Sequence, residues 1–482
     1  MRKTRAVMAA FGLALILALA GCPNGNDSPP SLITWSAAPN HDTGTTAIDF
    51  VFSAPVNATL ESFAIGLGTG RLIEGGVTGD GREWSLGVEV TRPGNVSVSV
   101  AIPGVESGPR TVEVFAATLY NVAAVSAGAA HAMAIGTSDS LWVWGNNGGG
   151  RLGDGTNEHR FNPTHVQSGM RWAYVSAGTN HSVAIRDDGT LWAWGSNHNG
   201  QLGDGTTDER LTPIQIGEHA DWISVSVGDR HTVGIREGNV LWAWGDNGQG
   251  QLGDGGATGG SAVPALIPGT WKRVSAGMQH TVGIQTDGTL WAWGDNAQGR
   301  LGIGHVPPGG ETDIRQTPTR VGEATWSLVA AGNQHTAGIQ TDGTLWTWGH
   351  AGSGRLGNGQ TSPHVGSPWH VAGATWISVD VGSSQTVGIQ SDGSLWAWGM
   401  NGTFGQLGIG TTEANRQTPS EVDVAHETKW TSVSVGSNFG MAMRSDGTLW
   451  AWGNNGQGRL GDGTEIHRLS PTQIGMLKEA GD

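Results

Sequence analysis

The sequence predicts an all-β chain in which a seven-bladed β-propeller follows a small N-terminal β-sandwich domain. Three observations predict it. The 482 residues are too many for one ordinary domain, so at least two folded units are expected. The composition combines 81 glycines and 23 tryptophans with only 14% charged residues, which indicates many turns around buried aromatic surface. A tryptophan motif also recurs seven times at nearly equal spacing.

Residues 1–21 are predicted to be a signal peptide. Arg2, Lys3 and Arg5 precede a short apolar run, which is too brief to span a membrane as a helix. The run ends in Leu-Ala-Gly-Cys at Cys22, and this resembles the lipobox of bacterial lipoproteins. The resemblance implies a lipid on Cys22 that attaches the chain to a membrane. The expected location is therefore the bacterial cell envelope, either periplasmic or surface-exposed.

Cys22 is the only cysteine, so the chain cannot form an internal disulfide. The alternative to lipidation is a free thiol beside small residues that resemble a cleavage site by chance. Residues 22–31 are rich in Pro, Asn, Ser and Asp, and this composition predicts a flexible tether between the anchor and the folded body.

Residues 32–119 show a different pattern. Apolar and polar residues alternate over 48–52, 84–90 and 96–102, and turn residues separate these runs. Several short alternating strands predict an antiparallel sandwich. The stretches at 34–36, 50–53 and 111–115 resemble bacterial immunoglobulin-like modules, which implies a spacer or adhesive role.

Residues 120–475 contain the repeats, and 476–482 form a short tail. The motif Leu-Trp-x-Trp-Gly occurs seven times, with successive copies 49 to 55 residues apart. Its second tryptophans are expected to pack between blades as the structural residues of the repeat: Trp144, Trp194, Trp244, Trp293, Trp348, Trp398 and Trp452. A solenoid would need polar end caps, and the first and last copies have none, so the pattern favours a closed ring.

Each copy is predicted to form four strands. In the second copy these are 172–177, 181–186, 191–194 and 212–216. Asp188-Gly189 predicts a two-residue hairpin between the second and third strands. Residues 175–185, 188–189, 191–195 and 200–203 resemble the regulator of chromosome condensation repeat, and all seven copies match it. The resemblance implies a seven-bladed propeller, often closed by strands from both chain ends, but no single activity.

Three patterns suggest chemistry and have simpler explanations. G-x-G-x-x-G occurs in four copies without a following helix, so turns explain it better than a dinucleotide site. Five histidines share one repeat position, where Gln385 and Phe439 stand in the last two copies, which favours packing over metal binding. The aspartates that follow Leu-Gly are expected to cap loops rather than bind calcium. No catalytic motif stands out, so we predict no enzyme, cofactor or metal.

The formal net charge of −15 argues against nucleic-acid binding, which normally needs a basic face. Protein recognition is expected where the copies differ, with loop drift as the alternative. The candidate partner-binding residues are His305, Glu311, Asp313, Arg315, Trp369 and Phe404. The leading prediction is a membrane-anchored, non-catalytic scaffold for a protein partner. A carbohydrate-binding or adhesive propeller is the alternative, followed by a glycan-cleaving enzyme.

Overall fold

The structure is a computed structural model that divides into two compact units, Met1–Tyr120 with Gly475–Asp482, and Asn121–Ile474. In the second unit it describes residues 122–166, 169–256, 259–308, 311, 313–422 and 429–474, and it also describes Gly475 directly after that unit. In the first unit it describes the backbone of seven strands. Among the described residues, no helix is long and apolar enough to cross a membrane.

The strands of the first unit form two antiparallel sheets. One sheet has the order β1 (Leu32–Asn40), β2 (Thr45–Phe52), β5 (Glu83–Val90) and β4 (Gly70–Gly79). The other has the order β3 (Phe63–Gly66), β6 (Asn95–Val100) and β7 (Arg110–Phe115). Strands β2, β5 and β6 lie where apolar and polar residues alternate in the sequence.

The second unit repeats one antiparallel arrangement in which four strands pair in chain order. The first strands are β8 (Val122–Ala127), β12 (Trp172–Ala177), β16 (Trp222–Val227), β20 (Trp271–Ala276), β27 (Trp376–Val381) and β31 (Trp430–Val435). The second strands are β9 (His131–Gly136), β13 (His181–Arg186), β17 (His231–Arg236), β21 (His280–Gln285), β24 (His335–Gln340), β28 (Gln385–Gln390) and β32 (Phe439–Arg444).

The third strands are β10 (Leu141–Gly145), β14 (Leu191–Gly195), β18 (Val240–Gly245), β22 (Thr289–Asp295), β25 (Leu345–Gly349), β29 (Leu395–Gly399) and β33 (Leu449–Gly453). The fourth strands are β11 (Arg160–Val166), β15 (Arg210–Gln215), β19 (Ser261–Ile267), β26 (Val365–Val371), β30 (Arg416–Val422) and β34 (Arg468–Ile474). Short 3-10 turns follow four of the third strands: η2 (Gly148–Gly150), η3 (Ala297–Gly299), η5 (Gly352–Gly354) and η6 (Gly456–Gly458).

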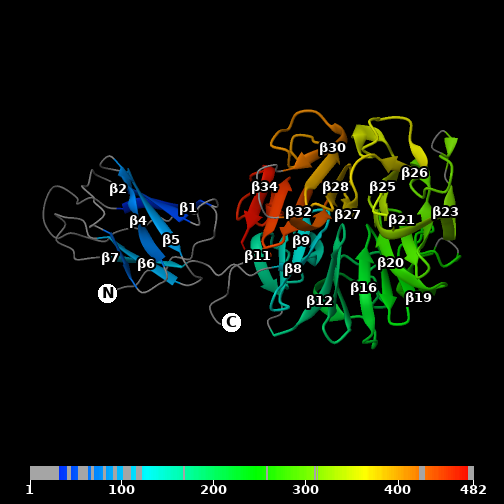
Figure 1. The fold of residues 1–482 in the computed structure, drawn as a ribbon. Helices are drawn as coiled ribbons and strands as arrows, with labels where there is room; N and C mark the ends of the chain where they lie inside the picture. The colour runs from blue at the N-terminus through cyan, green and yellow to red at the C-terminus, as the bar shows by residue number, and fades with distance from the viewer. Residues whose placement is uncertain are drawn as a thin grey trace. The chain divides into compact units, whose positions relative to one another are not determined.

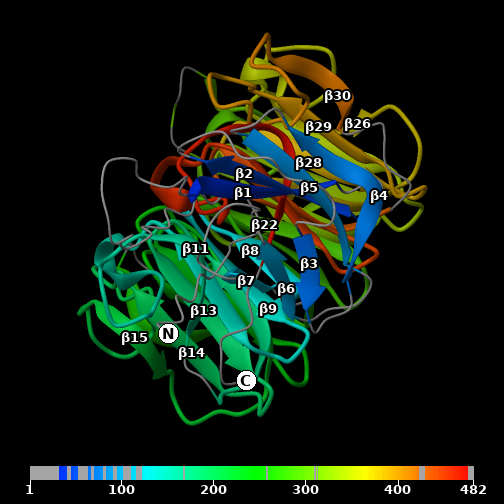
Figure 2. The same ribbon diagram turned by 90° about the vertical axis from the view of Figure 1, so that its left-hand side faces the viewer.

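One long strand, β23 (Ile314–Ala331), belongs to two successive repeats. Its first part pairs with β22 and its last part, from Trp326, pairs with β24. The result is a single seven-stranded sheet, β20 to β26, whereas the other sheets of this unit have four strands. The all-β prediction is confirmed, and the sheets follow one another in chain order around a ring (Figures 1 and 2).

The second tryptophan of each motif forms the core between neighbouring sheets. Trp194 is fully buried and packs with Met133, Leu141 and Val166 of the preceding sheet. The last glycine of Gly-[Gln/Arg]-Leu-Gly lies against this ring: a Cβ on Gly153, where φ is +74°, would lie 2.7 Å from Trp194. A turn with positive φ and close contact with an indole therefore explains this motif.

The first tryptophan of the motif is only partly buried in most repeats; in the second copy, Trp192 donates from Nε1 to Thr190 Oγ1 at 2.9 Å. Two local predictions for this copy need correction. The hairpin between its second and third strands is longer than predicted. Gly189 alone has positive φ, at +79°, and its N–H donates to Arg186 O at 3.0 Å. The loop is therefore a three-residue turn with a glycine bulge, because Asp188 keeps negative φ and caps Thr190 N at 3.0 Å. The fourth strand β15 also begins at Arg210, two residues before the predicted start.

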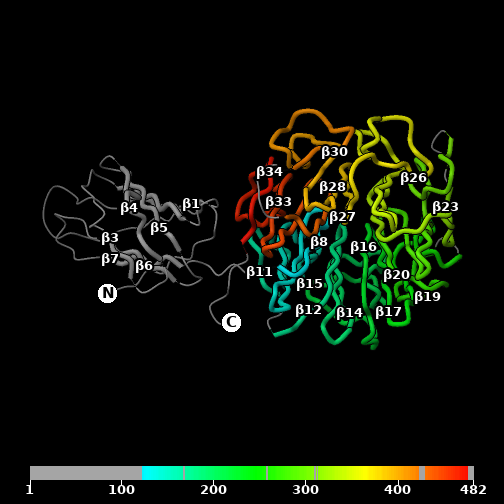
Figure 3. The backbone as a smooth tube through the Cα atoms, in the orientation of Figure 1, coloured from blue at the N-terminus to red at the C-terminus, as the bar shows by residue number. Residues whose placement is uncertain are grey.

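The ring closes without a sheet shared by the two chain ends, unlike the closure that the family resemblance implied. The first sheet contains only β8 to β11 and the last only β31 to β34. Between them, Ala127 N donates to Ser434 Oγ at 2.9 Å and Gly463 N donates to Phe161 O at 2.9 Å. Neighbouring sheets elsewhere in the ring make the same kind of contact, as where Gly155 N donates to Leu211 O at 2.9 Å. Figure 3 traces this circuit from cyan to red.

Candidate functional site at the centre of the ring

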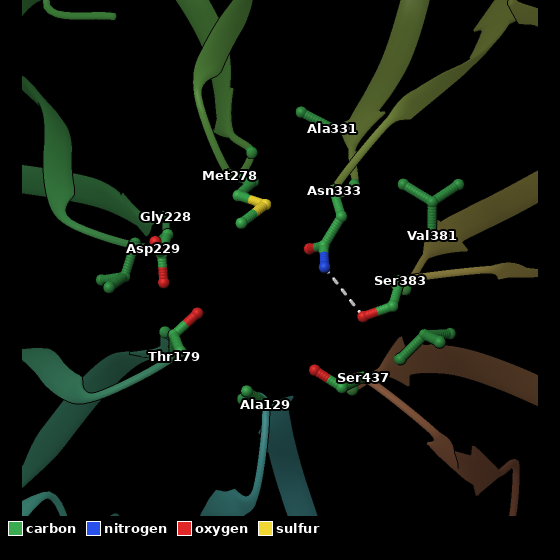
Figure 4. A pocket seen from close by; sticks show the side chains of 18 of the residues that line it. Ala129, Thr179, Gly228, Asp229, Met278, Ala331, Asn333, Val381, Ser383 and Ser437 are labelled. Atoms are coloured by element: carbon green, nitrogen blue, oxygen red, sulfur yellow. Dashed lines mark hydrogen bonds between the residues drawn. The ribbon is translucent and has the colours of Figure 1, made fainter. Parts of the chain in front are cut away.

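A cavity opens where the first strands of the repeats end. Its empty space, part of which is open solvent, measures about 430 Å³, and three consecutive residues from each of the seven repeats line it. The third residue of each triplet forms what we call the funnel: Ala129, Thr179, Asp229, Met278, Asn333, Ser383 and Ser437. Figure 4 shows their side chains around the opening, with Asn333 Nδ2 donating to Ser383 Oγ at 2.9 Å.

The middle residue of each triplet is glycine, because neighbouring repeats approach closely here. A Cβ on Gly228 would lie 2.4 Å from Gly277 O of the next repeat. The N–H of each described funnel residue from Ala129 to Asn333 donates to the glycine carbonyl of the following repeat, as Met278 N does to Gly332 O at 3.2 Å. The backbone is thus held in place, whereas the funnel side chains differ between repeats.

The repeated histidines connect neighbouring sheets. His181 Nε2 lies 2.9 Å from Thr232 Oγ1 of the next repeat, and that hydroxyl donates to Gln201 O at 2.8 Å. Since a hydroxyl has one proton and the carbonyl can only accept, the imidazole must be the donor at Nε2. We call this contact the latch. It occurs in five repeats, with histidine-to-hydroxyl distances of 2.8 to 3.0 Å: His131–Ser182, His181–Thr232, His231–Thr281, His280–Thr336 and His335–Thr386.

The exceptions to the latch vary together in sequence. At the histidine position, the sixth repeat has Gln385 and the seventh has Phe439. At the hydroxyl position, where the others have serine or threonine, the seventh repeat has Gly440 and the first has Ala132. Where the next repeat offers Gly440, the latch residue is Gln385, whose Nε2 donates to Gly436 O at 3.0 Å. Where the next repeat offers Ala132, the latch residue is the apolar Phe439. This covariation between repeats was present in the sequence and was missed, although it could have identified the latch.

Burial keeps the latch histidines neutral. It lowers the pKa of His181 to about 3 and that of His231 to about 4, and it lowers the pKa of the other three as well. In each of them Nδ1 is buried and has no hydrogen-bond partner in the part of the chain that the structure describes. The five latch histidines therefore have a structural role. Within the described residues, no three histidine, cysteine or acidic side chains gather where a metal ion could bind.

The aspartates after Leu-Gly hold the loops between third and fourth strands. Asp154 accepts from Asn147 Nδ2 at 2.9 Å and from Arg160 Nε at 2.6 Å, and the second and seventh repeats repeat this cluster. In the fourth repeat, where Ile303 replaces the aspartate, Asp313 takes the role. It contacts Asn296 Nδ2 at 2.7 Å, His305 Nε2 at 2.9 Å and Arg315 Nη2 at 3.1 Å.

The structure therefore brings three predicted partner-binding residues, His305, Asp313 and Arg315, into one cluster of mutual contacts, in which His305 and Arg315 stay partly exposed. The others lie apart from it. Trp369 lies on the outer strand β26 with half of its surface exposed. Phe404 packs edge-on against His467 of the next repeat, with ring centroids 4.9 Å apart, and Glu311 is exposed. Cys22 lies outside the described residues.

Sequence reasoning selected loop residues and missed the funnel. Its signal is the pair of variable residues between the middle glycine of each triplet and the latch position; the first of the pair is the funnel residue, which is Ala, Thr, Asp, Met, Asn, Ser and Ser in the seven copies. The glycine before the pair is the same in every copy, so variation directly after it indicates side chains that the repeat itself does not fix.

Comparison with known proteins places this geometry in context. The RCC1-like domain matches residues 76–361 and again 223–481. The Ultraviolet-B receptor UVR8 of Arabidopsis thaliana is 33% identical over 148 residues, which are 30% of this chain and 33% of the receptor. E3 ubiquitin-protein ligase HERC2 of Homo sapiens is 27% identical over 153 residues, 31% of this chain and 3% of the ligase. The matches thus span a third or less of these relatives.

Solved structures show the same fold. Human WBSCR16 superimposes with a TM-score of 0.63 at 21% identity, covering 70% of this chain and 94% of that one. Yeast RCC1 (Prp20), solved with Kap60 bound, gives a TM-score of 0.61 at 21% identity, covering 67% of this chain and 79% of that one. The predicted β-propeller is therefore confirmed as a fold.

Proposed function

The chain belongs to the RCC1-like domain family, and on that premise we propose that it is a non-catalytic scaffold that binds a protein partner at the funnel. The observation that carries this proposal is the contrast at the centre of the ring. Seven repeats converge there with a shared backbone and seven side chains that differ between repeats, of which Asn333 and Ser383 contact each other. A rigid frame that presents variable side chains is typical of a recognition site.

The first and last strands of the propeller reach the edge of the sheets away from the funnel. The propeller begins at Val122, whose N–H donates to Gly447 O of a hairpin at 3.1 Å, and it ends at Ile474, which pairs with Leu449 after the same hairpin. Both ends of the ring therefore lie at the hairpin edge of the sheets. The funnel lies at the opposite edge, where the first strands finish.

Neighbouring structures support a protein partner. The yeast RCC1 (Prp20) structure has Kap60 bound, and another structure of Prp20p is described with its binding to Gsp1p and histones. The cavity lining also favours protein over carbohydrate, because none of its described residues is aromatic. A carbohydrate site would be expected to expose an aromatic ring beside polar groups, and the exposed Trp369 lies on an outer strand instead.

The same proposal includes the number of blades, the identity of the first unit and the lipid anchor. Counting β23 once for each repeat it serves, the ring has seven blades. The first unit is proposed to be an immunoglobulin-like spacer, and the lipid on Cys22 to anchor the chain at the bacterial envelope.

A bulky substitution in the funnel tests whether the partner binds there. Thr179→Trp fills the opening with an indole, and we expect it to abolish saturable capture of the partner by the immobilised protein. Ile223→Trp is the matched control, since Ile223 is exposed near the hairpin edge of an inner strand. Equal capture by wild type and Thr179→Trp, or equal loss in both variants, would place the binding face elsewhere.

Removing the lipid site tests the anchor. Cys22→Ser lacks the thiol that a diacylglyceryl group would modify, so we expect the variant to move from the membrane fraction to the soluble fraction when cells are fractionated. Cys22 is the only cysteine, and therefore the substitution disturbs no disulfide. An unchanged membrane fraction would contradict the proposed anchor without affecting the proposed binding face.

A further inference from the structure

The funnel has one charged side chain. Asp229 is the only acidic or basic residue among its seven members, and 84% of its side chain is buried in the wall, since 16% is exposed. Its nearest cation is the neighbouring Arg230, whose Nε lies 3.4 Å from Oδ2 and whose side chain is 59% exposed. This long contact on a solvated arginine contributes little, so the carboxylate keeps most of its capacity to bind another cation.

Fixed positive charge surrounds other parts of the funnel. In the Gly-[Gln/Arg]-Leu-Gly motif, an arginine Nη1 donates to the carbonyl oxygen of a funnel residue in the next repeat at 2.9 to 3.4 Å. Four such pairs occur: Arg151–Thr179, Arg300–Asn333, Arg355–Ser383 and Arg459–Ala129. Three of these arginines have no carboxylate partner among the described residues; only Arg300 has one, with Nη2 3.4 Å from Asp295 Oδ2.

Glutamine replaces this arginine beside Asp229 and Met278. The motif position that is arginine in those four pairs is Gln201 in the repeat before Asp229 and Gln251 in the repeat before Met278. Their side-chain oxygens accept from Asn199 N and Gln249 N, each at 2.8 Å, and carry no charge. The exposed Arg230 is then the described cation beside Asp229, and the one acidic side chain of the funnel lies where Asp229 and Met278 come from adjacent repeats.

Met278 supplies an apolar surface beside this carboxylate. Its side chain is 38% exposed and extends toward the cavity, as do Asp229 and the hydroxyl of Thr179 (Figure 4). A thioether adapts to an alkyl chain, and a carboxylate with a nearby hydroxyl accepts hydrogen bonds from an ammonium group. The net charge of −15 also attracts a cation from a distance.

We propose that the funnel takes a cationic side chain, lysine or arginine, from the partner protein, with its alkyl stem on Met278 and its charged group on Asp229. The inference rests on the proposed function. It adds the chemistry of the segment that enters the funnel: a basic residue at an exposed tip of the partner.

The binding of short peptides tests the inference directly. Acetyl-Gly-Gly-Lys-Gly-Gly-amide is titrated into the purified protein at low ionic strength, beside versions with arginine or norleucine in place of lysine. We expect the basic peptides to bind at least tenfold more tightly than the norleucine peptide. Free n-butylamine distinguishes a small-amine site from a peptide site, and binding of the amine as tight as that of the lysine peptide would overturn the assignment to a protein side chain.

Two variants change the charge of the funnel in different ways, so the test does not depend on the folding of either variant alone. Asp229→Asn removes the carboxylate, and Gln251→Arg adds the guanidinium that four other repeats carry at this position. Both are expected to lower lysine-peptide affinity about tenfold. Asp208→Asn, which removes an equal charge from an exposed loop, is expected to leave it unchanged. Wild-type affinity in both funnel variants would overturn the inference.

The partner assay separates this inference from the proposed function. If Thr179→Trp abolishes partner capture while Asp229→Asn and Gln251→Arg leave it intact, the funnel binds a protein but not through a basic residue. If no saturable protein partner is found with wild type, the proposed function itself fails.

Discussion

Replacing His231 with glutamine is expected to make the protein less sensitive to acid. His231 is fully buried, donates from Nε2 to Thr281, and has a pKa lowered to about 4 by burial. In the unfolded chain its pKa returns to the ordinary value of 6.5. Between these values the unfolded state binds a proton that the folded state does not. The free energy of unfolding therefore falls by about 1.4 kcal/mol per pH unit as the pH decreases.

Five latch histidines act in the same direction. Together they lower the free energy of unfolding by about 7 kcal/mol for each unit by which the pH decreases. The total stability of a domain is on the order of 5–15 kcal/mol. We therefore expect the propeller to unfold within about two pH units below 6.5. Asp380 opposes this trend: burial raises its pKa to about 6, so below that pH the folded state binds the extra proton and gains stability. One opposing carboxyl group does not offset five histidines.

The measurement is the free energy of unfolding by urea at pH 7.0 and at several values down to pH 5. Glutamine at this position is compatible with the fold, since Gln385 occupies it in the sixth repeat. His231→Gln should show a slope smaller by roughly 1.4 kcal/mol per pH unit. The control is His198→Gln, at an exposed site, which should keep the wild-type slope. An unchanged slope in His231→Gln would contradict the neutral latch.

Truncating a core tryptophan is expected to cost the most of any single substitution at neutral pH. Trp244 is fully buried, packs with Leu202 and Ile216, and meets Trp222 edge-on with ring centroids 5.8 Å apart. A Cβ on Gly203 would lie 2.7 Å from Nε1 of this tryptophan. Trp244→Ala should lower the free energy of unfolding by about 3–5 kcal/mol, because a rigid seam between sheets cannot close around the cavity.

Trp242, two residues earlier on the same strand, is the matched control. Its ring is partly exposed and lies under Arg236, 5.4 Å from the guanidinium carbon. Trp242→Ala should cost only about 1–2 kcal/mol. Urea unfolding at pH 7.0, followed by far-UV circular dichroism, measures both variants. Equal losses would show that the seams between sheets are no more sensitive than the surface.

Local sequence patterns predicted the strands well, and they failed where short turns allow alternatives. The motif Leu-Trp-x-Trp-Gly indicated the third strands because alternation and aromatic residues are typical of buried strands. Asp188-Gly189 indicated a hairpin, but the dipeptide alone could not distinguish a two-residue turn from a three-residue turn with a glycine bulge. That choice depends on the pairing of Ile185 with Leu191, which is a property of the assembled sheet.

The sequence by itself determined the repeating four-stranded unit and its buried tryptophans, because the spacing of turns and apolar residues is a local property repeated seven times. Only the tertiary structure decided what joins the copies. The latch connects residues about 50 positions apart, Asp313 replaces an aspartate from a different place in its loop, and the funnel gathers one residue from every repeat. These contacts cross between sheets, and their partners are fixed by the closure of the ring rather than by any neighbouring residue in the chain.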